Sequence, residues 1–230
     1  MARVSKEFEV RKQEIMNIAQ SLFYQKGYTN TSVNLIIETI GISKGTFYHY
    51  FKSKEDLLDS ITQEFTDQIL ERINPIVNDN SLNAIEKLNQ FYRLSGMYKA
   101  DNFSLLQTLI KIFIDDANLI LRDKIKLKSY LRTAPIFTQI LTQGKKEGVF
   151  DISHPKETAQ MILHLGSAVS DETGKLFVDV NSHPENIQKL ILHFDIYQKS
   201  VERILGAPEN SIKIMDGNFI SKLQEWCNEN

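Results

Sequence analysis

The feature that most constrains this chain is the segment 29–58, in which two short groups of apolar residues are separated by a glycine. The segment reads TNTSVNLIIETIGISKGTFYHYFKSKEDLL. Apolar residues recur at helical spacing over 33–40, which predicts a short amphipathic helix. Gly41 then breaks the chain, and Ser43 is suited to cap a second short helix with its phenylalanines on one face. The segment therefore predicts two short helices joined by a glycine turn.

Residues on both sides of this segment also have the periodicity of amphipathic helices. A regular apolar stripe over 15–23 predicts a helix that ends at Gly27, and another helix begins at Ser53 and stops at 74–75. The chain beyond shows no strand alternation, and Pro135 is expected to kink or divide one helix. Further helices are expected at about residues 81–98, 103–114, 118–146, 154–180 and 184–206, with a short terminal helix or a partly frayed tail over 211–230.

These helices predict an all-α fold with two parts. The three N-terminal helices form a helix-turn-helix head, which we expect to occupy residues 1–53. The remainder, residues 54–230, is expected to form a larger helical domain. A helix over 54–73 would connect the two parts.

Composition narrows the classes of protein to consider. No apolar run among the 230 residues approaches the length of roughly 18 that spans a bilayer, and no membrane partner is expected. The N-terminal residues mix charges and lack the apolar centre of a secretory signal. Cys227 is the single cysteine, so an internal disulfide cannot form and a cytoplasmic location is expected. The net charge is −2, so any nucleic-acid contact must depend on a local basic face.

The predicted helix pair has side chains suited to DNA. In a helix-turn-helix unit, one helix crosses the DNA backbone while the next enters the major groove by its N-terminal end. Gly45 would allow a close approach there, and free N–H groups at helix N-termini favour an anion. Such helix pairs also occur in bundles that bind no DNA, and Tyr50 is expected to pack against the first helix. The residues expected to face DNA are Thr31, Ser32, Lys44, Gly45, Thr46, Tyr48, His49, Lys52 and Lys54.

Residues 15–61 resemble the N-terminal signature of the tetracycline-repressor (TetR) family of bacterial transcription regulators. The resemblance rests on the stretches GYTNTSV and IGISKGTFYHYFKSKEDL, and the remainder is similar only in its helical layout. The resemblance implies a homodimer with a three-helix DNA-binding head and a larger effector-binding body. It also implies base contacts for Lys44 and Thr46, and phosphate contacts for Tyr48, His49, Thr31 and Lys54.

Small residues recur on one face of the penultimate long helix, at Gly166, Ser170 and Gly174. Small side chains permit a close helix crossing. With the regular apolar stripe of the last long helix, they suggest a four-helix dimer interface, and ordinary packing within one subunit is the alternative. A two-fold dimer would place two reading helices about 34–36 Å apart on a near-palindromic operator. The stripe residues assigned to the interface are Ile191, Phe194, Tyr197 and Val201.

The middle helices combine apolar side chains with a polar stripe. Apolar walls with a few convergent polar groups are typical of a small-molecule site, so a partly apolar effector is expected. The competing interpretation is that the aromatic residues are core and that His164 and Asp171 contact each other or a second subunit. The candidate lining residues are Phe103, Leu106, Gln107, Ile110, Phe113, Phe137, Ile140, Leu141, His164, Ser167 and Asp171.

Other functions compete with that of a ligand-responsive transcriptional repressor. An enzyme would need a nucleophile–base pair, a phosphate-binding glycine loop or a metal signature, and the sequence contains no such pattern. His154, His164, His183 and His193 match no metal-ligand spacing, so neither a metal nor another cofactor is expected. A DNA-binding regulator controlled by a partner protein, or one that activates transcription, fits the same residues.

Overall fold

The structure is a computed structural model that describes residues 2–215 and 217–229, except for the side chains of residues 2–6, 218 and 227–229. The side chain of Cys227 thus lies outside the described part. The described residues form helices and loops without a β-strand, which confirms the all-α prediction. The helices are α1 (Ala2–Lys26), α2 (Val33–Ile40), α3 (Lys44–Tyr50), α4 (Lys54–Val77), α5 (Ala84–Asp101), α6 (Phe103–Phe113), the 3₁₀ helix η1 (Asp116–Asn118), α7 (Leu119–Glu147), α8 (Pro155–Val178), α9 (Asn186–Leu205) and α10 (Gly217–Glu229).

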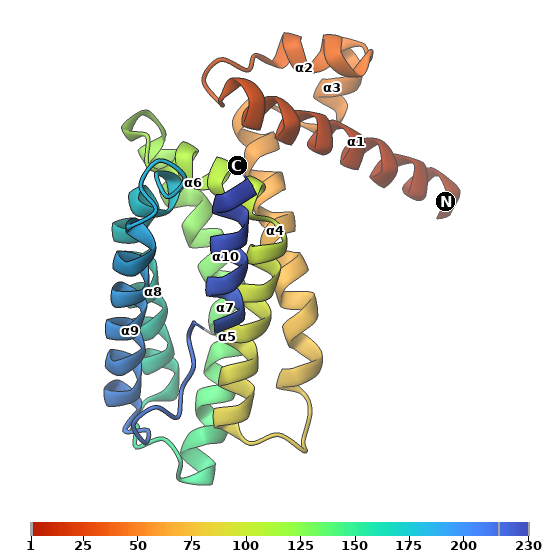
Figure 1. Ribbon diagram of the computed structural model, residues 1–230. Helices are drawn as coiled ribbons and strands as arrows, with labels where there is room; N and C mark the ends of the chain where they lie inside the picture. Colours follow the sequence, from red (N-terminus) through yellow and green to blue (C-terminus); the bar gives the residue numbers. More distant parts are fainter. Residues whose placement is uncertain (1, 216, 230) are drawn as a thin grey trace.

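Helices α1 to α3 form a small head at one end of a longer helical bundle (Figure 1). α4 begins in the head and continues along the bundle, where it packs against α5 and α7. α8 and α9 pack together on the side of the bundle away from α4. α10 lies beside α5, and Lys222 of α10 forms an ion pair with Asp101.

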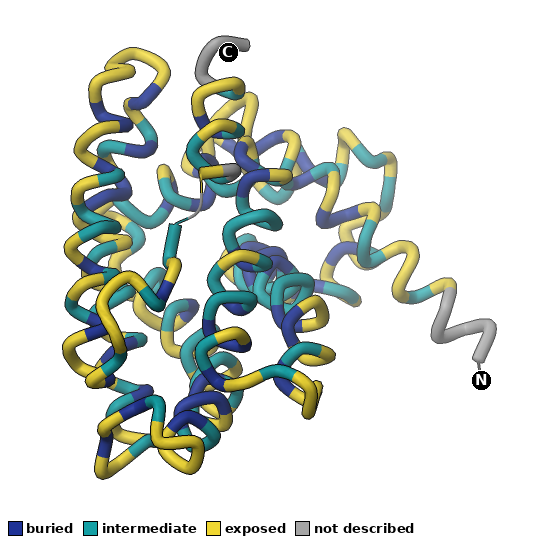
Figure 2. The backbone as a smooth tube through the Cα atoms, turned by 60° about the horizontal axis from the view of Figure 1, so that its bottom comes forward, coloured by how far each residue is buried: buried dark blue, intermediate teal, exposed yellow. Residues whose placement is uncertain are grey.

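Three clusters of buried side chains hold the helices together, and buried residues follow the inner faces of the helices (Figure 2). The head cluster includes the fully buried Ile15, Phe47 and Leu57. The main body cluster surrounds Phe137, and a third cluster joins α6, α8, α9 and α10 around Phe103. α4 contributes side chains to the head cluster and to the main body cluster, and the head cluster also includes Leu109 and Ile112 of α6, so both helices join the head to the body.

Serine N-caps set the starts of the helices that form the head and leave it. The Oγ atoms of Ser32, Ser43 and Ser53 each accept a hydrogen bond from the backbone N–H three residues later, at the starts of α2, α3 and α4. Gly41 ends α2 in the left-handed conformation, with φ of 73°. Glycine adopts this conformation without steric cost. The observed angle confirms the predicted glycine turn.

Two prolines lie inside helices, one of which the sequence predicts to stop at Pro75 and the other to kink or divide at Pro135. α4 extends beyond Pro75, and α7 continues as one helix across Pro135. A proline leaves the carbonyl four residues earlier without its helical donor. Those carbonyls belong to Glu71 and Leu131, which are both exposed. Because water can bind an exposed carbonyl, each helix can continue past its proline.

None of the helices within the described ranges is long and apolar enough to cross a lipid bilayer.

Candidate nucleic-acid interface

α3 has one buried face and one open face. Phe47 is fully buried in the head cluster, and Phe51 caps the end of the helix at 1 % exposure. The other face carries Lys44, Tyr48 and His49, which are all exposed. A short helix anchored by two aromatic rings and open on its other side has the geometry of a helix that reads DNA.

Gly45 is the most informative position on the open face. A Cβ added there would meet only the Oγ of Ser43, at 3.7 Å, which is an ordinary van der Waals distance. The fold therefore has room for alanine, although glycine inside a helix costs about 0.5–1 kcal/mol relative to alanine. Packing within the chain therefore does not explain the glycine.

Other predicted contact residues carry hydroxyl or ammonium groups. The Oγ1 of Thr46 lies 2.8 Å from the Oγ of Ser43, so a local hydrogen bond orients it. Ser32 is exposed, and its Oγ accepts from the N–H of α2, which leaves the hydroxyl hydrogen able to bond a phosphate oxygen. Lys44 and Lys52 are exposed and form no ion pair within the described part of the chain.

Phe8, which the sequence reasoning missed, supports the far end of α3. Its ring lies 4.6 Å from the ring of Tyr50 and 5.6 Å from that of His49, measured between centroids. Tyr50 thus packs against α1, as predicted. α1 begins earlier than the predicted stripe, and Phe8 lies seven positions before Ile15, on the same helix face. Extending the stripe towards the N-terminus would have identified it.

Two predicted DNA contacts are directed into the head instead. Thr31 is fully buried, and its Oγ1 donates to the carbonyl of Gly27 at 2.8 Å, so it holds the loop between α1 and α2. The Nζ of Lys54 donates to the carbonyl of Tyr28 at 2.8 Å and lies 4.1 Å from the centre of the Tyr28 ring. Burial lowers the pKa of Lys54. Thr31 is thus a structural residue rather than a phosphate contact. The side chain of Lys54 is already bonded to Tyr28 within the head.

The predicted effector-lining residues do not come together in one site. Phe137, Ile140 and Leu141 are fully buried in the main body cluster. Phe103 belongs to the cluster near α10, whereas Phe113 packs against the head cluster. Helical periodicity identified the buried apolar side chains Phe103, Phe137, Ile140 and Leu141 correctly, but it does not determine which inner faces meet.

Two residues of the polar stripe predicted on α8, His164 and Asp171, lie on an outer face. His164 is exposed and stacks on the ring of Tyr130, with centroids 4.9 Å apart. Asp171 is exposed and forms an ion pair with Lys126. Both partners belong to α7, so within this chain His164 and Asp171 join two helices and do not contact each other.

Part of the predicted set remains partly accessible on α6 and α8. Leu106, Ile110 and Ser167 are half-buried. Gln107 is buried, and its Nε2 donates to the carbonyl of Val178 at 3.1 Å, which ties α6 to the end of α8. These residues remain candidates for contact with an effector.

The small residues of α8 pack inside one subunit, which corrects the predicted dimer face. A Cβ at Gly166 would lie 2.7 Å from the hydroxyl of Tyr197, which itself donates to the carbonyl of Ile162 at 3.1 Å. Gly174 is buried against α6, and Val201 is fully buried. The close helix crossing exists, but it joins α8 to α9 and α6 of the same chain.

The outer faces of α8 and α9 carry a different set of apolar side chains. Of the other predicted interface residues, Ser170 is exposed, whereas Ile191 and Phe194 pack partly against the core of their own subunit. Large apolar side chains that remain in solvent are uncommon in contiguous groups on monomers. The exposed side chains here are Met161 at 67 %, Leu192 at 57 %, Ile196 at 54 % and Ile204 at 38 %.

Burial shifts the pKa of several groups in the body. Burial raises the pKa of Tyr92 and of Tyr197, whose hydroxyl oxygens lie 3.4 Å apart. Burial also lowers the pKa of Lys99, whose Nζ has no hydrogen-bond partner among the described residues. Lys99 follows Tyr92 by two helical turns, so both lie on the same face of α5.

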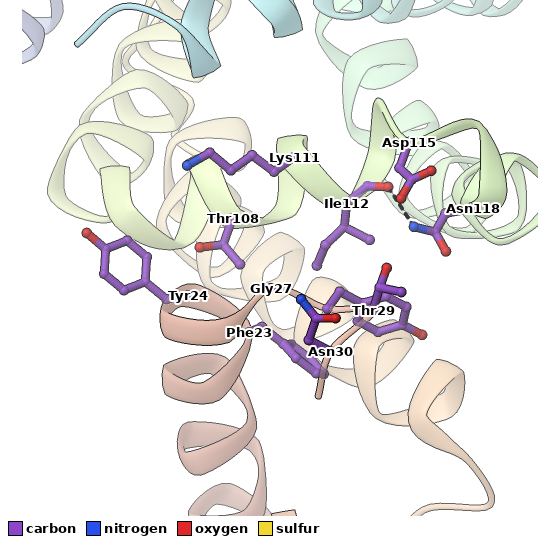
Figure 3. Close-up of a pocket in the computed structure, with 11 residues that line it drawn as sticks. Phe23, Tyr24, Gly27, Thr29, Asn30, Thr108, Lys111, Ile112, Asp115 and Asn118 are labelled. Atoms are coloured by element: carbon purple, nitrogen blue, oxygen red, sulfur yellow. Dashed lines mark hydrogen bonds between the residues drawn. The ribbon is translucent and has the colours of Figure 1, made fainter. Parts of the chain in front are cut away.

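A pocket of about 380 Å³ lies between the head and the body (Figure 3). The head wall consists of the last turn of α1 and the following loop, including Tyr24 and Tyr28. The body wall consists of α6, η1 and the residues between them, including Lys111 and Asp115. The two walls are distant in sequence, so no local pattern could have predicted this pocket.

An open reading helix on a three-helix head, joined to a helical body, defines a helix-turn-helix DNA-binding regulator. Residues 15–61 match the family model of bacterial regulatory proteins of the tetR family, and residues 107–178 match that of the tetracyclin repressor-like C-terminal domain. The chain belongs to the TetR family and is a DNA-binding transcriptional regulator.

Similar proteins include named regulators. The Fatty acid metabolism regulator protein of Bacillus subtilis is 32% identical over 142 residues, which cover 59% of this chain and 68% of that protein. The HTH-type transcriptional repressor KstR2 of Mycobacterium tuberculosis is 28% identical over 161 residues, covering 65% and 74% of the two chains. The crystal structure of a TetR-family regulator from Syntrophomonas wolfei superimposes with a TM-score of 0.63 at 25% identity, over 82% of this chain and 95% of that one.

Proposed function

We propose that this regulator is a repressor that binds a near-palindromic operator as a homodimer and leaves it when a small-molecule effector binds the body. The observation that carries the proposal is the open face of α3, where Gly45 leaves space that the fold does not need. The name of the similar KstR2 protein, a transcriptional repressor, supports repression rather than activation.

The proposed DNA contacts follow from exposure and position on α3. Lys44 and Thr46, at its N-terminal end, would contact base edges, and Gly45 would allow the approach. Tyr48 and His49, with the nearby Lys52 and Ser32, would contact phosphates. Replacing Tyr48 by Ala should then weaken binding to all sequences, whereas replacing Lys44 should relax the preference at particular bases.

The proposed dimer uses the outer faces of α8 and α9. Leu192 and Ile196 lie four residues apart on α9, and Met161 is exposed on the neighbouring α8. Removing such side chains from water on dimerisation would contribute roughly 25 cal/mol per Å² of apolar area buried. A two-fold dimer would also place two copies of α3 on successive turns of the major groove.

The proposed effector is partly apolar and binds between α6 and α8. The half-buried Leu106 and Ile110 with Ser167 combine apolar walls and a hydroxyl, and the name of the similar Bacillus subtilis protein associates that protein with fatty acid metabolism. The effector would release DNA only if it binds more tightly to a dimer whose heads no longer match successive grooves.

A gel-shift titration tests this proposal. Purified full-length protein should shift DNA from upstream of its own gene at low salt, and competitor DNA of unrelated sequence should not remove the shift. Long-chain fatty acids are the first probes for release. Failure to shift any DNA fragment selectively at micromolar protein would contradict the proposed repressor.

A further inference from the structure

The pocket between the head and the body has a buried hydroxyl group without a partner. Tyr28 lines this pocket, and its side chain is 8 % exposed. Its hydroxyl oxygen is buried and has no hydrogen-bond partner among the described residues. Burial is the main cause that raises the pKa of Tyr28, so the hydroxyl keeps its proton and can donate. A buried donor without an acceptor is costly, and a ligand could supply the acceptor once the side chains around this hydroxyl had moved to expose it to the pocket.

Two opposite charges lie at different ends of the same pocket. Lys111 and Tyr24 lie towards one end, and Asp115 and Asn118 towards the other (Figure 3). Lys111 and Asp115 do not pair with each other. The Nζ of Lys111 donates to the side-chain oxygen of Gln107 at 3.3 Å, and one oxygen of Asp115 accepts the N–H at the start of η1 at 3.0 Å. Both groups therefore retain capacity for a charged partner.

Apolar surface lies between these ends. Phe23 contributes to the head wall of the pocket. Ile112, the residue after Lys111, contributes to the body wall. An aromatic or aliphatic ring can pack on such surfaces while polar groups at both of its ends are bonded.

We propose that this pocket binds a small dipolar molecule with an acidic group near Lys111, an amine near Asp115 and a ring-sized apolar body. Its volume of about 380 Å³ suits a compact ligand. The site is separate from the effector site proposed between α6 and α8. Its ligand would touch the head and the body at once, and would therefore set how the two are held relative to each other.

A hydrogen-bonded chain connects this pocket to α8. Lys111 donates to Gln107, and Gln107 donates to the carbonyl of Val178 at the end of α8. The ligand should consequently change operator affinity, and the operator should change ligand affinity by the same factor. Only this consequence rests on the proposed repressor function, because binding to the pocket is measurable without DNA.

Calorimetry on the full-length protein tests the site with 4-(aminomethyl)benzoate, which has a carboxylate and an amine at opposite ends of one ring. Benzoate and benzylamine each retain one of these groups. We expect saturable binding of the dipolar probe, about tenfold or more tighter than either single-charge compound, as expected for a second charge-assisted hydrogen bond. Equal binding of benzoate would overturn the dipolar class, and no saturable binding of the dipolar probe would overturn the site.

Substitutions assign the binding to this pocket. Lys111→Met and Asp115→Asn should each weaken binding of the dipolar probe about fivefold or more. Asparagine is chosen at position 115 because it can still cap η1. Tyr28→Phe should weaken it without lowering the melting temperature, because the deleted hydroxyl has no partner in the fold. The matched controls Lys124→Met and Asp123→Asn, which are exposed on α7, should leave binding unchanged. Unchanged binding in both Lys111→Met and Asp115→Asn would place the probe elsewhere and overturn the proposal.

Discussion

At the scale of single residues, the fold and the proposed function make opposite demands at Gly45. The helix would be more stable with alanine, and the nearest atom to an added Cβ leaves room for it at 3.7 Å. A residue that costs stability without any packing need within the chain indicates selection by a partner. The neighbouring Thr46, by contrast, also has a structural role, because its Oγ1 is hydrogen-bonded to the Oγ of Ser43.

We predict that Gly45→Ala stabilises the protein and weakens its binding to DNA. Stability should rise by about 0.5–1 kcal/mol, because alanine favours the helix. Operator affinity should fall about tenfold or more, since the methyl group would meet the DNA. Denaturant unfolding and gel-shift titration measure the two effects.

Gly96→Ala provides the matched control for this substitution. Gly96 lies inside α5, and an added Cβ there would also have its nearest contact at 3.7 Å. The Gly96→Ala variant should be more stable than the wild type and should bind the operator with unchanged affinity. Undiminished operator binding by Gly45→Ala would contradict the assignment of the open face of α3.

Lys99 predicts a pH dependence of stability. Burial lowers its pKa below the ordinary value of 10.5, so between the lowered pKa and 10.5 the unfolded chain holds more protons than the folded one. Lys99 alone therefore makes the free energy of unfolding rise with pH through this window, whereas the raised pKa values of Tyr92 and Tyr197 make it fall as the pH passes their ordinary value of 10.0. Lys99→Met should reduce that rise, as measured by urea unfolding at a series of pH values. An unchanged pH profile in Lys99→Met would show that the ammonium is solvated in the folded protein.

At the scale of secondary-structure elements, the role of each stripe of residues depends on which helix packs against it. The small residues of α8 allow α9 to approach within one chain, and the ring of Tyr197 fills the space above Gly166. α4 belongs to two clusters and continues from the head into the body. The pocket beside α1 and α6 is another place where head and body meet.

We predict that Gly166→Ala destabilises the fold of each subunit. The added Cβ would lie 2.7 Å from the Tyr197 hydroxyl, so the ring or the helices must move. Such overpacking costs about 1–3 kcal/mol, to be measured by chemical unfolding. Ser170→Ala, one turn later on an exposed position, should leave stability nearly unchanged. If Gly166→Ala weakens only dimerisation, the packing within the subunit described here is wrong.

The limits of sequence reasoning are clearest between neighbouring elements. Ser43 and Gly41 act through bonds and dihedral angles within a few residues, so their roles in α2 and α3 were predictable. Thr31 carries the same kind of hydroxyl as Ser32 and is adjacent to it, yet it is buried. That difference arises from the packing of the loop onto α1. Gly166 was assigned to the wrong surface for a similar reason, because periodicity identifies a face but not its partner.

At the scale of the whole molecule, the account requires two heads held at a fixed separation. We predict that Ile196→Lys, on the exposed face of α9, produces monomers because a charge would be buried at the dimer interface. Analytical ultracentrifugation measures the change in mass, and operator affinity should fall with it. Val10→Lys, at a similarly exposed apolar position of α1, should remain dimeric. A wild-type protein that is monomeric at micromolar concentration would contradict the proposed interface.

The most direct test is to sequence the DNA fragments retained by the purified protein from a random pool. The account predicts one enriched near-palindrome whose half-sites are separated by about 10–10.5 base pairs or a multiple of that spacing, and its loss with Gly45→Ala. Retained fragments without a common sequence, or with the same sequence enriched by Gly45→Ala, would contradict the claim that the open face of α3 reads DNA.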